Sequence, residues 1–172
     1  MHNRCYNDSG GFFMGVKMNI EVIKEDILKI QEGIVCHQVN CMGAAGGLAG
    51  AIFRKYPAAQ QEYKITVQSF VEDWLPLGTV NLVNIDDKLF VANLFAQYEY
   101  GTESRKTEYG TFRMCLRDLV GAARFLKKIP KTIYFPYGIG CGLGGGNWEI
   151  IRGIIKYELV DYDFKVVICH KD

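Results

Sequence analysis

Glycines gather in two short windows of the sequence, residues 43–50 and 138–146. These windows hold ten of the 19 glycines: Gly43, Gly46, Gly47, Gly50, Gly138, Gly140, Gly142, Gly144, Gly145 and Gly146. Glycine lets backbone N–H groups come close to a ligand, and a helix N-terminus that follows adds partial positive charge. Two such loops side by side would bind a diphosphate without lysine or arginine. The alternative is that each window is only a tight turn.

His37 stands close to the first window, on a segment rich in β-branched residues, 34–39. A histidine at the end of a strand and beside a ligand loop can act as a general acid or base. The alternative is a hydrogen-bonded core histidine, which is the commoner case on a strand. Asn40 lies on the same segment, where the two side chains can point to one site. Cys36 and Cys41 flank them, and a nucleophilic cysteine would need a lowered pKa.

Several other chemistries are not favoured by the sequence. None of the three serines lies in a G-x-S-x-G motif, which argues against a serine hydrolase. The three histidines and six cysteines show no metal-ligand spacing, so we expect no metal, and we expect reduced cysteines in a cytoplasmic protein. Residues 140–145 spell G-x-G-x-x-G, but only one helix and one strand are expected after them. That is too little for a conventional dinucleotide-binding enzyme.

Strands and helices alternate around these residues. We expect strands at 19–23, 34–39, 79–84, 89–95, 132–135 and 164–169, and helices at 48–56, 57–71, 107–128 and 148–159. Each glycine window therefore follows a strand and opens a helix. The alternation predicts an α/β domain with helices on both faces of the sheet. A hairpin turn at Asp86 and Asp87 predicts that the sheet is mixed.

The composition is that of one globular domain. The chain has 172 residues, of which 49% are hydrophobic and 23% are charged, and its net charge is +1. The balance of charge argues against a nucleic-acid partner, although it leaves room for a local basic patch. No apolar run has the length of a membrane helix, and no secretory signal is evident. We expect residues 1–17 to be a loose extension of a domain at 18–172.

Three segments resemble the macro domain family. They are CHQVNCMGAAGGLAGAIFRKYP at 36–57, NLFAQ at 93–97 and PYGIGCGLGGGNW at 136–148. The resemblance is nearest to the ADP-ribose-1''-phosphate phosphatases and related small microbial and phage macro domains. It implies a three-layer α/β/α sandwich with a mixed, mostly parallel central sheet. It also implies that the protein binds ADP-ribose or a derivative, with an ADP-ribosylated protein as a further candidate partner.

The resemblance assigns ligand contacts to individual residues. Asp26 matches the acid that binds the adenine amino group, with Ile27 beside it, and the alternative for Asp26 is a helix cap. Asn40 matches the asparagine next to the distal ribose. The two loops would contact the distal ribose and the diphosphate through Gly43, Gly46, Gly47, Leu48, Gly138, Ile139, Gly140, Cys141, Gly142, Leu143 and Gly144.

The resemblance also suggests an activity. It implies a hydrolase of the ADP-ribose-1''-phosphate phosphatase or ADP-ribosyl hydrolase type, which acts at the distal ribose without metal or cofactor and uses His37 and Asn40. A reader that binds ADP-ribose without turnover is the alternative, and a nucleotide enzyme that binds NAD is the third hypothesis. Gln97 and Gly144 stand where one class of macro domain glycohydrolase has a lysine and an aspartate. A mechanism through a lysine adduct is therefore not expected.

Overall fold

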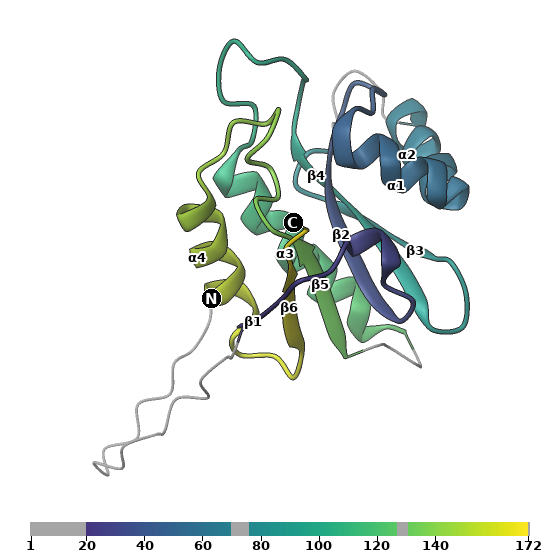
Figure 1. Ribbon diagram of the computed structural model, residues 1–172. Helices are drawn as coiled ribbons and strands as arrows, with labels where there is room; N and C mark the ends of the chain where they lie inside the picture. Colours follow the sequence, from purple (N-terminus) through teal and green to yellow (C-terminus); the bar gives the residue numbers. More distant parts are fainter. Residues whose placement is uncertain (1–19, 70–75, 127–130, 172) are drawn as a thin grey trace, which may run out of the picture.

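The computed structural model describes residues 20–69, 76–126 and 131–171. The extension expected at residues 1–17 lies outside these ranges. Within them, the strands are β1 (Ile20–Ile23), β2 (Gly33–Asn40), β3 (Val80–Asn84), β4 (Leu89–Gln97), β5 (Thr132–Pro136) and β6 (Lys165–Cys169). They form one sheet in the order β1-β6-β5-β2-β4-β3 (Figure 1). Every neighbouring pair is parallel except β3 and β4, which confirms the mixed, mostly parallel sheet.

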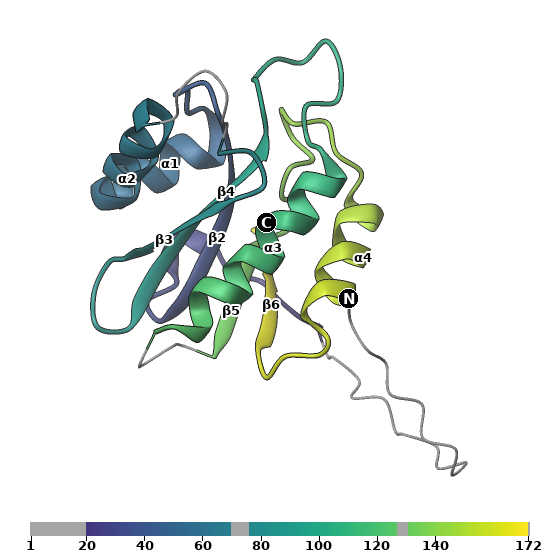
Figure 2. The same ribbon diagram turned by 180° about the vertical axis from the view of Figure 1, so that it is seen from behind.

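Helices cover both faces of this sheet. The helices α1 (Gly47–Lys55) and α2 (Pro57–Ser69) lie on one face, together with the short 3-10 helix η1 (Ile27–Lys29). The helices α3 (Tyr109–Arg124) and α4 (Trp148–Leu159) lie side by side on the other face (Figures 1 and 2). The predicted three-layer α/β/α sandwich is therefore confirmed. No helix in the described ranges is both long enough and apolar enough to span a membrane.

The central strands are buried on both faces, which gives the domain two hydrophobic cores. On β2, Ile34 and Cys36 pack toward α3 and α4, whereas Val35 and Val39 pack toward α1 and α2. This explains why β2 and β4 read as almost continuous apolar runs in the sequence. A polar side chain on either strand must therefore find a partner inside the protein or face the end of the sheet.

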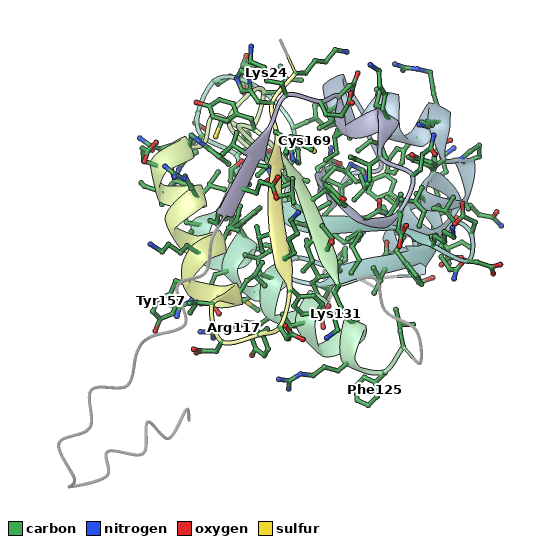
Figure 3. The ribbon with its side chains drawn as sticks, turned by 60° about the horizontal axis from the view of Figure 1, so that its bottom comes forward. Lys24, Arg117, Phe125, Lys131, Tyr157 and Cys169 are labelled. Carbon is green, nitrogen blue, oxygen red and sulfur yellow. The ribbon has the colours of Figure 1, made fainter. Side chains whose placement is uncertain are left out.

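The start of α3 differs from the predicted one, whereas the turn between β3 and β4 is as predicted. The helix expected from residue 107 begins at Tyr109, because Thr107 instead forms a short antiparallel bridge with Gln97. The predicted hairpin between β3 and β4 is present, and the Asp86 carboxylate accepts the N–H groups of Lys88 and Leu89 at 2.8 and 2.9 Å. Phe125, just after α3, points away from the body of the domain (Figure 3).

Candidate functional site

A cavity of about 730 Å³ lies at the carboxyl ends of β2, β4 and β5. Its walls are formed by His37, Gln38, Val39, Asn40, Ala44, Ala45, Gly46, Gly47, Leu48, Ala49, Gln97, Tyr100, Gly101, Thr102, Pro136, Tyr137, Gly138, Ile139, Gly140, Gly142, Leu143 and Gly144. The two glycine windows thus lie side by side on one cavity. In an open α/β sheet this end of the strands is the usual place for a ligand.

The first glycine loop leads directly into α1. Gly46 is the N-cap and makes no side-chain cap hydrogen bond, so the first N–H groups of α1 have no partner within the helix. Gly47 has φ +50°, a conformation that side chains with a Cβ rarely adopt. The first turn of α1 lines the cavity through Gly47, Leu48 and Ala49. These N–H groups and the helix dipole favour an anion.

Asn40 organises the first loop from inside. Its Oδ1 accepts hydrogen bonds from the Met42 N–H and the Tyr63 hydroxyl, both at 2.9 Å. Its Nδ2 donates to the Ala44 carbonyl oxygen at 2.8 Å. Burial raises the pKa of Tyr63 to about 12, so the phenol stays protonated and keeps donating. Asn40 lines the cavity, but its side-chain amide already makes hydrogen bonds to the first glycine loop and to α2.

The second glycine loop is held through its carbonyl oxygens. The Thr107 hydroxyl donates to Gly140 O at 2.7 Å, and the N–H groups of Lys106 and Thr107 donate to Gly144 O at 2.9 Å. Gly140 has φ +71°, and a Cβ added there would lie 2.6 Å from the Gln38 side chain. Only glycine therefore lets this loop lie so close to β2.

The side chain of Gln38 on β2 also holds the Thr107 hydroxyl in place. Gln38 Nε2 lies 2.7 Å from the Thr107 hydroxyl oxygen and 2.6 Å from Gln97 Oε1. The Thr107 side chain is fully buried, so losing its partners would leave buried polar groups unpaired. Sequence reasoning missed Gln38, Thr107 and Tyr63. Their partners lie 19 to 69 residues away along the chain, and no local pattern marks them.

His37 lies on the cavity wall but is only 1% exposed. Its Nε2 is 2.6 Å from Asn93 Oδ1, and Asn93 Nδ2 donates to Ala59 O at 2.9 Å. Because the Asn93 Oδ1 can only accept a hydrogen bond, the proton of the neutral His37 ring is assigned to Nε2. Within the described residues the buried Nδ1 has no hydrogen-bond partner. Burial lowers the pKa of His37 to about 4. At neutral pH the ring is uncharged, so it can accept a proton at Nδ1 but is not a general acid.

Asp26 lies outside the cavity wall, at the carboxyl end of β1. Its Oδ1 accepts the Leu28 N–H at 3.0 Å and caps η1, and its Oδ2 lies 2.7 Å from Lys171 Nζ. The hydrogen bond with Lys171 and the cap hold the pKa of Asp26 below its ordinary value. The neighbouring Ile27 is buried in the core beneath α1 and α2. The capping role is therefore present, while the role of Asp26 toward adenine stays a prediction.

An aromatic cluster lies at the edge of the cavity. Tyr137 lines the cavity, and its ring centroid lies 4.5 Å from that of His170 and 4.9 Å from that of Trp148. The Tyr137 N–H donates to Cys169 O at 2.8 Å, which fixes the cluster at the ends of β5 and β6. Half of the Tyr137 side chain is exposed, so one part of its ring is free to contact a ligand. Sequence reasoning did not single out this cluster.

The cysteines near the cavity are not activated. Burial raises the pKa of Cys36 and that of Cys41, the latter to about 11, and it also raises the pKa of Cys141. All three are therefore thiols at neutral pH and poor nucleophiles.

Of the predicted contact residues, Cys141 and Gly43 do not line the cavity, and neither do Asp26 and Ile27. Among the described residues, no group of three or more His, Cys, Asp or Glu side chains could hold a metal ion.

Two known proteins are similar to this chain in sequence along most of its length. No family model matches the sequence. An uncharacterized 17.5 kDa protein of Enterobacteria phage T4 is 30% identical over 164 residues, which are 88% of this chain and all of the relative. A Bacteroides thetaiotaomicron protein of unknown function is 30% identical, with a TM-score of 0.76 over 90% of this chain and 99% of that one.

Named structures share the same fold. The macrodomain of Mycobacterium tuberculosis DarG has a TM-score of 0.72 and 20% identity, over 90% of this chain and 98% of that one. The chain has the macro domain fold. Thermosipho africanus DarTG, a structure in complex with ADP-ribose, matches this macro domain with a TM-score of 0.70 and 18% identity, over 90% of this chain and 43% of that one.

Proposed function

We propose that this macro domain binds ADP-ribose or a derivative in the cavity between the two glycine loops. The observation that carries the proposal is the pairing of the α1 N-terminus with the second glycine loop on one cavity wall. Both present backbone to the ligand, which suits a diphosphate. The cavity of about 730 Å³ is within the range expected for nucleotide-sized ligands. The likeness to Thermosipho africanus DarTG, described with ADP-ribose, supports the same ligand.

Titration calorimetry with ADP-ribose, ADP and AMP tests this proposal. ADP-ribose should bind with micromolar affinity, about −8 kcal/mol. ADP should bind less tightly because it lacks the distal ribose, and AMP should bind much less tightly because it lacks a phosphate as well. An affinity for AMP equal to that for ADP-ribose would show that the diphosphate and the distal ribose do not contribute to binding.

Hydrolysis at the distal ribose is a second candidate function. The observation that favours it is the position of His37 on the cavity wall, with Nδ1 unpartnered among the described residues. A neutral imidazole with a pKa of about 4 is a weak base, so turnover should be slow. Among the residues that the structure describes, no Asp, Glu, Lys or Arg lines the cavity to share the proton transfer. Binding without turnover, as in a reader module, is the function that this lining supports better.

Product analysis separates the reader from the hydrolase. The protein is incubated with ADP-ribose-1''-phosphate and with an ADP-ribosylated protein, with and without chelator, and released phosphate and ADP-ribose are measured. A hydrolase that uses His37 should lose about 10²- to 10⁴-fold in rate in His37→Ala. Binding of ADP-ribose with no product from either substrate would establish the reader. A rate unchanged in His37→Ala would take His37 out of the chemistry.

A further inference from the structure

The β4 end of the cavity differs from the glycine loops in its chemistry. Here the wall is formed by Gln97, Tyr100, Gly101 and Thr102, from the end of β4 and the loop after it. Figure 1 shows this loop rising beside the second glycine loop. Its polar groups are neutral amides and hydroxyls, and in residues 20–69, 76–126 and 131–171 no charged side chain lines the cavity.

The cations of this loop are already engaged. Lys106 Nζ lies 2.6 Å from Glu99 Oε1 and 3.6 Å from Glu103 Oε2, and the Lys106 side chain is only 10% exposed. The Arg105 guanidinium lies over the Tyr109 ring, 4.1 Å from its centroid, at the start of α3. A phosphate group at this end would have to compete with two carboxylates for Lys106. Nothing at the β4 end is therefore arranged to bind a dianion.

Exposed aromatic and apolar side chains surround the same end. Tyr100 lines the cavity and is 63% exposed, so its ring is accessible to a ligand. Tyr98 and Met42 are exposed beside it, and the hydrogen bond from Cys41 N to Tyr98 O, at 2.9 Å, joins their two loops. A tyrosine face of this kind stacks well on a planar ring.

We propose that the β4 end of the cavity binds a planar, uncharged ring joined to the distal ribose, in preference to a terminal phosphate. The inference rests on the proposed binding of ADP-ribose, with its distal ribose toward the β4 end. Tyr100 supplies the stacking face, and the neutral side chain of Thr102 lines the same end. A ring of this kind could belong to a nicotinamide or to a nucleobase, which share this chemistry.

Four ligands that differ only at the distal ribose test the inference by calorimetry. They are ADP-ribose, ADP-ribose-1''-phosphate, NADH with its uncharged ring, and NAD⁺ with its cationic ring. We expect NADH to bind at least as tightly as ADP-ribose and the phosphate derivative to bind at least about tenfold less tightly. NAD⁺ should bind no more tightly than NADH. A phosphate derivative that binds more tightly than ADP-ribose, or NAD⁺ far tighter than NADH, would overturn the proposal.

Variants locate the ring. Tyr100→Ala should lower the affinity for NADH about tenfold more than it lowers the affinity for ADP-ribose, the effect of losing one stacked ring. Tyr100→Phe should restore the affinity for NADH. Tyr157→Ala is the matched control, because Tyr157 is 58% exposed on α4, outside the cavity (Figure 3). An equal loss for both ligands in Tyr100→Ala would refute the ring site. If ADP-ribose itself fails to bind, the proposed function fails instead.

Discussion

The hydroxyl of Thr107 donates a hydrogen bond of 2.7 Å to the carbonyl oxygen of Gly140. This contact joins the segment after β4 to the second glycine loop across 33 residues of sequence. Gln38 on β2 holds the same hydroxyl from the other side, at 2.7 Å. The shape of the second glycine loop thus depends on β2 and on the segment after β4, neither of which the loop follows.

Replacing Thr107 tests whether these hydrogen bonds serve binding. Thr107→Val keeps the shape of the side chain but removes both hydrogen bonds, and it leaves Gly140 O and Gln38 Nε2 without this buried partner. We expect a loss of about 1–3 kcal/mol in the free energy of unfolding and a weaker affinity for ADP-ribose. Thr111→Val on α3 is the control, because the Thr111 hydroxyl donates to the Glu108 carboxylate one turn away and does not contact the second glycine loop. Lower stability with unchanged affinity would make the Thr107 hydrogen bonds structural only.

The glycine loop itself is tested at Gly142. A Cβ at this position meets nothing within 4 Å, and its φ is not in the left-handed range, so the fold should accept a side chain. Gly142 lines the cavity, where valine would occupy space needed by the diphosphate. Gly142→Val should therefore keep its melting temperature and lose most of its affinity for ADP-ribose. Gly153→Val on α4, which also has open space around its Cβ, should keep both. Normal binding by Gly142→Val would reduce the loop to a turn.

Asp26 has two candidate roles that mutation can separate. Loss of the η1 cap in Asp26→Ala should cost about 1 kcal/mol in the free energy of unfolding. If the carboxylate also binds the adenine amino group, the affinity for ADP-ribose should fall by about 1–3 kcal/mol. Lys171→Ala removes the ion pair but leaves the carboxylate, so it should not weaken binding. An affinity unchanged in Asp26→Ala, together with lower stability, would leave only the cap.

The buried His37 predicts how stability depends on pH. The folded protein holds the pKa of His37 at about 4, below the ordinary value of 6.5. The unfolded chain therefore binds this proton first as the pH falls, and the stabilisation by neutral His37 is complete above pH 6.5. Between pH 6.5 and 4 up to about 3 kcal/mol should be lost. Denaturant unfolding of the protein and of His37→Gln measures this, and parallel pH profiles of the two would contradict it.

The sequence predicted the sheet, both helix layers and the two glycine loops, because these depend on local patterns. The central parallel strands are mostly apolar, and each glycine window follows one of them. Partners across strands could not be predicted in the same way. His37 lies opposite Asn93 in the β2–β4 register, and the separation of 56 residues gives no local signal for the pair. The same holds for Lys171, which reaches Asp26 from near the other end of the chain.

The helix boundary at α3 shows the same limit. The apolar spacing from residue 107 is helical, but Thr107 pairs with Gln97 and bonds to Gly140 instead of joining the helix. The contacts of Thr107 with the second glycine loop and with Gln97 thus outweigh its local preference for a helix. The position of Tyr137 in the cavity wall depends on β5 and β6 lying side by side, which the sequence order does not reveal.

Binding of ADP-ribose between the two glycine loops can be tested by one calorimetric titration. The protein is titrated with ADP-ribose and then with AMP under the same conditions, with Gly142→Val as the parallel sample. We expect a single site per chain with micromolar affinity for ADP-ribose, much weaker binding of AMP and a large loss of affinity in the variant. No heat of binding with ADP-ribose, or equal affinities for the two nucleotides, would contradict it.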